Sequence, residues 1–109
     1  EPIRDKEQEY FVCISLNGAH EVIEDRVVTK GLVNQTQIHP REIFAPVLED
    51  RATAVIFAHN HPSGSMEAGK EDLNLTEKLV DAAKILGIDV LDHIIITHHG
   101  YNSILDSGL

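Results

Sequence analysis

The sequence predicts an α/β (α+β) domain in which helices flank a mixed β-sheet. Two observations support this fold class: an opening pair of β-branched, apolar runs joined by an Asn-Gly turn, and an alternation of strand-like and helix-like segments after it. A hairpin supplies antiparallel strands and strand–helix–strand crossovers supply parallel ones, so we expect the sheet to contain both. The 109 residues have the length of one domain, and residues 1–109 show neither a repeat nor a linker.

The opening hairpin is predicted over residues 10–31. Aromatic and β-branched residues predict a strand at 10–17, the Asn-Gly pair predicts a two-residue turn, and residues 21–31 return as the second strand. Cys13, the single cysteine of the chain, is expected to be a small buried apolar side chain of the first strand. One cysteine permits no intramolecular disulfide, which is typical of a reducing, cytoplasmic setting.

The central segment predicts a helix followed by a buried strand. The helix covers residues 39–50, with Pro40 in the first turn, where its missing N–H costs nothing, and with Pro46 inside, which predicts a short or kinked helix. Its apolar face consists of Ile43, Phe44, Val47 and Leu48. Residues 53–59 form a short, continuous apolar run between charged residues and a loop, the pattern of a central buried strand.

A longer amphipathic helix is predicted over residues 70–86, and Gly87 stands where a C-terminal cap belongs. The predicted apolar stripe consists of Leu73, Thr76, Leu79, Val80, Ala83 and Leu86. After this helix, residues 88–97 predict another strand, and a turn then leads into a last short strand near Ile104.

Charge and hydropathy exclude two classes of partner. The formal net charge is −9, and the nine Lys and Arg residues form no basic stripe, so direct nucleic-acid binding is not expected of this domain. No apolar run approaches the roughly 20 residues that cross a bilayer, and the charged N-terminus is not typical of a signal peptide. We therefore expect a cytoplasmic protein without a membrane span. Self-association into a homo-oligomer is compatible with the sequence.

Two histidines directly follow the predicted buried strand, in the motif HNHPSG at 59–64. Alternate residues of an extended chain point to the same side, so His59 and His61 can present two imidazoles to one metal ion. Because the chain has no thiolates to spare, the third ligand is expected to be a carboxylate. Asp72 is the best candidate, since it lies in the first turn of the longer helix, where a negative charge is favoured.

Three further side chains could take part in a site at this motif. Glu67 and Glu71 compete with Asp72 for the third ligand position and rank below it. His93 interrupts the apolar run at 88–97 beside an aspartate, and an Asp–His pair of this kind can orient a metal ligand from outside.

Together these motifs resemble the RadC-like branch of the JAMM (JAB/MPN) metalloproteases. HPREIF, HNHPSG, Asp72 and DHIII, in that order, carry the resemblance, which extends from about Glu9 to the C-terminus. It implies a three-layer fold similar to that of cytidine-deaminase-like domains, in which helices sandwich a mixed sheet. It also implies that His59, His61 and Asp72 bind Zn²⁺ with water as the fourth ligand.

The resemblance implies a general base upstream of the two histidines and a serine that stabilises the oxyanion. Glu9 is the best match to the base, and Glu7 is its rival. The serine should stand eight residues after the second histidine, where this chain has Gly69. Ser63, Ser65 or a backbone N–H would have to replace that hydroxyl, and the loss of one such donor costs roughly 10²–10³ in rate.

The function implied by the resemblance is that of a zinc-dependent hydrolase of the metallopeptidase or isopeptidase type, in a family associated with DNA repair. Its substrate would be a peptide or isopeptide. The glycine at position 69 motivates one alternative, a catalytically weak or inactive scaffold that binds partners. The other alternative is an accessory protein of DNA metabolism without peptidase activity.

Overall fold

A five-stranded mixed sheet forms the framework of the computed structural model, which describes residues 9–30, 38–61, 64–65 and 69–105. In spatial order the sheet contains β2 (Val22–Lys30), β1 (Tyr10–Leu16), β3 (Ala54–Asn60), β4 (Asp89–Thr97) and β5 (Gly100–Ser103). β3 and β4 are parallel, and the other neighbouring pairs are antiparallel. The predicted mixed sheet is therefore confirmed.

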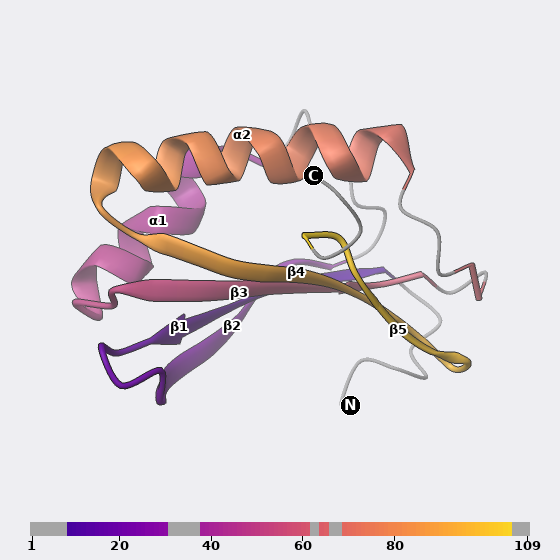
Figure 1. Cartoon of the computed structure of the whole chain (residues 1–109), viewed down its shortest axis with the longest axis horizontal. Coiled ribbons are helices and arrows are strands. Elements are labelled where there is room, and N and C mark those ends of the chain that lie inside the picture. The colour runs from indigo at the N-terminus through magenta and orange to yellow at the C-terminus, as the bar shows by residue number, and fades with distance from the viewer. Residues whose placement is uncertain (1–8, 31–37, 62–63, 66–68, 106–109) are drawn as a thin grey trace.

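The two described helices, α1 (Pro40–Glu49) and α2 (Lys70–Leu86), pack on one face of this sheet (Figure 1). Their apolar side chains share one core with the residues of β1 and β3 that point to the same side; its members include Phe11, Phe44, Val55, Phe57 and Leu79. Cys13 belongs to this core, as predicted, and burial raises the pKa of its thiol to about 12. Within the described ranges, no helix is long and apolar enough to cross a membrane.

The described residues form two layers, where the family resemblance implied three. The opposite face of the sheet carries a smaller apolar cluster around Ala58 and Ile96, with Tyr10, Val12 and Ile94 packed against it. Each described helix has one apolar side, and both of these sides contribute to the same core. No described helix therefore remains to cover the opposite face.

The sheet-facing side of α2 differs from the predicted stripe. Its buried residues are Leu75, Thr76, Leu79 and Ala83. Leu73 and Val80 are only half-buried, and Leu86 is 42% exposed. Residues four apart lie on the same side of a helix, so the buried side also includes Asp72, four residues before Thr76. The helix thus turns an acidic side chain toward the sheet.

Three smaller differences concern the other elements. The prediction placed Leu48 on the buried face of α1, but it is 47% exposed. The hairpin turn needs more than two residues: Asn17 accepts two backbone N–H groups through its side chain, and the positive φ of 60° belongs to His20 rather than to the glycine. The last strand ends at Ser103, and Ile104 follows it as a fully buried residue.

Candidate metal centre

The end of β3 and the start of α2 meet at one edge of the sheet. His59 lies near the end of β3 and is 1% exposed, and its partner in the neighbouring strand β1 is Phe11. His61 follows the strand, and its backbone N–H donates to the carbonyl of Ile96 over 3.1 Å. Asp72 lies in the first turn of α2. The crossover from β3 through α2 to the parallel β4 brings these side chains to the carboxyl edge of the strands, where open α/β sheets place their ligands.

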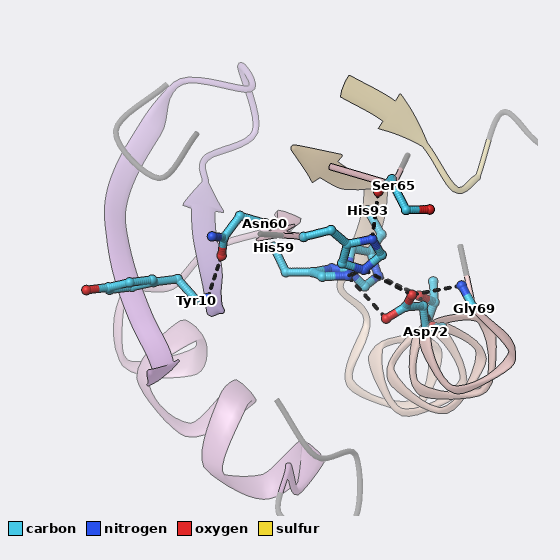
Figure 2. Close-up of polar contacts among 9 residues, drawn as sticks. Tyr10, His59, Asn60, Ser65, Gly69, Asp72 and His93 are labelled. Atoms are coloured by element: carbon cyan, nitrogen blue, oxygen red, sulfur yellow. Dashed lines mark hydrogen bonds and ion pairs between the residues drawn. The ribbon is translucent and has the colours of Figure 1, made fainter. Parts of the chain in front are cut away.

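Three donor atoms converge at this edge (Figure 2). Nε2 of His59 lies 2.9 Å from Nε2 of His61 and 3.1 Å from Oδ1 of Asp72. Nε2 of His61 lies 3.3 Å from Oδ2 of the same carboxylate. Two ligands of a tetrahedral zinc ion, each about 2.0–2.1 Å from the metal, lie roughly 3.3 Å apart. The three side chains therefore have the spacing of a ligand set that could hold a metal ion.

Each of these three side chains has an outer hydrogen-bond partner. Nδ1 of His61 lies 3.0 Å from the carbonyl oxygen of Ser65, which can only accept, so this nitrogen carries a proton and Nε2 of the neutral ring presents its lone pair. Oδ2 of Asp72 accepts the backbone N–H of Gly69 over 2.9 Å. Nδ1 of His59 lies 2.8 Å from Nε2 of His93. Such outer partners fix the orientation of metal ligands.

His93 reaches the site from β4 and is 0% exposed. Burial, followed by the proximity of His59, lowers the pKa of His93 to about 3, so its ring is neutral near pH 7. Its Nδ1 lies 2.5 Å from the hydroxyl of Thr76 on α2. The expected Asp–His pair takes another form: Asp92 accepts the backbone N–H of His93 over 2.8 Å. The ring of His93 is therefore hydrogen-bonded to the ring of His59 and to the hydroxyl of Thr76, and not to Asp92.

The charge of the site suits a cation. Burial pushes the pKa of Asp72 upward, but the adjacent imidazoles of His59 and His61 outweigh burial and hold that pKa well below its usual range. The hydrogen bond with Asp72, opposed by burial and supported by Ser65, raises the pKa of His61. The carboxylate is thus ionised, and its negative charge favours a cation beside it.

Glu9 precedes β1 on the side of the sheet that carries the site. It stands two residues before Phe11, the cross-strand partner of His59. Its negative charge contributes to the raised pKa of His61. A carboxylate therefore lies close enough to His61 to influence it electrostatically.

The remaining predicted site residues fall into two groups. Ser65 is exposed and contributes its backbone carbonyl to His61, and Glu71 is exposed on α2. Ser63, Glu67 and Glu7 lie outside the described residues.

Among the described residues at the centre, Thr76 was not expected there from the sequence. It was expected only as part of the apolar stripe of the helix. Its spacing of four residues from Asp72 is the signal that could have indicated a place on the same side of α2.

Comparison with known proteins gives one consistent result. The family model for the RadC-like JAB domain matches residues 1–109. A UPF0758 protein of Methanospirillum hungatei is 50% identical over 103 residues, which cover 94% of this chain and 46% of that protein. A UPF0758 protein of Trichlorobacter lovleyi is 46% identical over 107 residues, or 98% of this chain and 46% of the relative. The chain thus spans about half the length of the curated relatives it matches.

Proposed function

This chain belongs to the family of RadC-like JAB domains, and on that basis we propose that it is a zinc-dependent hydrolase of peptide or isopeptide bonds. The observation that supports this function best is the convergence of His59, His61 and Asp72, whose donor atoms lie 2.9–3.3 Å apart. Two imidazoles and one carboxylate form a ligand set typical of catalytic zinc sites, which keep a fourth position for water or substrate.

The donor chemistry fits a divalent cation. His61 donates its outer N–H to a carbonyl, so in the neutral ring the inner Nε2 directs its lone pair toward the carboxylate of Asp72. A cation would take the place of the proton that His61 otherwise shares with this carboxylate. Imidazole nitrogen together with carboxylate oxygen suits zinc.

The proposed reaction assigns one role to each group. A zinc ion held by His59, His61 and Asp72 would supply a water of lowered pKa and polarise the substrate carbonyl. Glu9 would take a proton from the attacking water and deliver it to the leaving amine, because one carboxylate can act first as a base and then as an acid. The ligands His59, His61 and Asp72 hold the centre on a strand end and a helix start, which keeps it rigid.

The test of this function is the zinc-loaded protein with a peptide and isopeptide library. We expect Glu9→Gln to lower hydrolysis by at least about 10²-fold while the zinc content stays unchanged, since only the proton acceptor is lost. Glu71→Gln, an exposed glutamate at the start of α2, is the matched control and should hydrolyse as the wild type does. Equal hydrolysis by Glu9→Gln and the wild type would exclude Glu9 as the base.

A second candidate is a scaffold that binds zinc and partners without efficient hydrolysis. The observation that favours it is Gly69, which stands where the family motif has a serine and therefore offers no hydroxyl. A wild-type protein that retains zinc but cleaves no member of the library would favour this second function.

A further inference from the structure

We propose that Thr76 is a positioning residue that fixes the tautomer of the ligand His59, acting through His93. The inference rests on the metal site proposed above, but it concerns hydrogen bonds that exist in the protein before any ion binds. The three residues come from three elements: His59 from β3, His93 from β4 and Thr76 from α2. We call this chain of hydrogen bonds the Thr76 relay.

The direction of the relay is set at the hydroxyl of Thr76. This hydroxyl donates to the backbone carbonyl of Asp72 over 2.8 Å, and a carbonyl oxygen can only accept. A hydroxyl has a single hydrogen, so its contact with His93, 2.5 Å away, must be one in which it accepts. Nδ1 of His93 therefore carries the proton.

The same logic passes through His93 to the ligand. A neutral imidazole with its proton on Nδ1 offers Nε2 only as an acceptor. Nε2 of His93 lies 2.8 Å from Nδ1 of His59, so Nδ1 of His59 must be the donor. His59 then carries its proton on Nδ1, and its Nε2 lone pair points toward Asp72.

The surroundings hold the rings and the hydroxyl of the relay in place. Thr76 and His93 are both 0% exposed, so no bulk water can replace a lost partner. The ring of His93 is also packed edge-on by Phe11 and Phe57, at centroid distances of 5.5 and 6.1 Å. A flipped or displaced ring would have to disturb both aromatic contacts.

Through the relay, the hydrogen bond between the Thr76 hydroxyl and the backbone carbonyl of Asp72 influences metal affinity. If Thr76 becomes valine, Nδ1 of His93 loses its acceptor, and the cost of a buried unpaired N–H favours the tautomer protonated on Nε2. That proton would point at Nδ1 of His59, which must then accept. His59 would carry its own proton on Nε2, where the lone pair for the metal is needed.

The experiment measures tautomers and affinity separately. Long-range ¹H–¹⁵N spectra of the metal-free wild type should show His59 and His93 protonated on Nδ1. Thr76→Val should move a substantial population of both rings to the Nε2–H tautomer, and zinc affinity should fall about 10–100-fold in a chelator competition. Thr76→Ser keeps the hydroxyl but is smaller than threonine, and it should show the tautomers and the zinc affinity of the wild type. If packing rather than the hydroxyl were responsible, the serine variant would be the more affected of the two.

Several results would overturn the relay. A wild type protonated on Nε2 at either ring contradicts it without any variant, so poor folding of Thr76→Val does not protect the proposal. Unchanged tautomers and unchanged zinc affinity in a folded Thr76→Val contradict it as well. If the wild type shows the expected tautomers but binds no zinc, the relay stands and the proposed metal function fails.

Discussion

At the scale of single residues, Gly69 affects the proposed metal binding and the proposed catalysis in different ways. It is the N-cap of α2, and its backbone N–H donates to the carboxylate of Asp72 over 2.9 Å. The glycine therefore orients a predicted ligand through its main chain, a function that any residue except proline can perform. What it cannot supply is the hydroxyl that the family motif places here. The orientation of Asp72 thus needs only the main-chain N–H of residue 69, whereas an oxyanion donor would need a side-chain hydroxyl at that position.

Gly69→Ser should raise hydrolysis of a cleavable peptide by about 10²-fold, because the serine restores one oxyanion donor. A Cβ at this position would lie 3.5 Å from Oδ2 of Asp72, an ordinary contact, so the substitution is tolerated. Steady-state kinetics of the zinc-loaded variant provide the measurement. Gly69→Ala adds the Cβ without the hydroxyl and should show no rise. Equal rates for the serine and alanine variants would mean that this hydroxyl does not limit the reaction.

The residues that could be predicted are those whose roles depend on local spacing. His59 and His61 are two apart at a strand end, and Asp72 falls in the first turn of the next helix, so one short segment carries the three candidate ligands. Thr76 could not be assigned in the same way. An apolar stripe and a hydrogen-bonding position look alike in sequence when a threonine fills them, and only the rotation of α2 distinguishes them.

At the scale of secondary structure, α2 determines the geometry of the centre. The structure turns the side that contains Asp72, Thr76, Leu79 and Ala83 toward the sheet. The sequence predicted the bounds of this helix and its cap at Gly87 correctly. It also predicted three of the buried residues, but it added the half-buried Leu73 and Val80 and the exposed Leu86 and missed Leu75. Rotation is the harder property to predict, since tertiary packing selects among several apolar residues on one helix.

The end of α2 offers a test of the helix by itself. Gly87 is the C-cap in the left-handed conformation, with a φ of 75°. Gly87→Ala should lower the free energy of unfolding by roughly 1–2 kcal/mol, because a Cβ disfavours this backbone conformation. Nothing lies within 4 Å of the added Cβ, so a steric clash does not contribute.

Urea denaturation followed by circular dichroism measures this effect. Gly18→Ala is the matched control, because its Cβ also meets nothing within 4 Å and its φ is not positive. The control should change the free energy of unfolding by less than about 0.5 kcal/mol. A Gly87→Ala variant as stable as the control would contradict the assigned cap.

At the scale of the whole molecule, strand order decides which distant side chains meet. β3 and β4 are adjacent and parallel, which places His93 beside His59 although the two are 34 residues apart. The alternation of strands and helices predicted a mixed sheet, and this is what the structure has. The order of strands and helices in the sequence does not determine on which face of the sheet each helix packs. The sequence therefore did not predict that both described helices contribute to the same core.

The most direct test of the account is the zinc content of the purified protein after metal removal, zinc addition and dialysis. We predict about one zinc ion per chain for the wild type and almost none for the His59→Ala/His61→Ala variant, because two of the three ligands are lost. A His98→Ala/His99→Ala variant removes two neighbouring histidines from the turn between β4 and β5 and should keep its zinc. Stoichiometric zinc in the His59→Ala/His61→Ala variant would contradict the assignment of the metal centre.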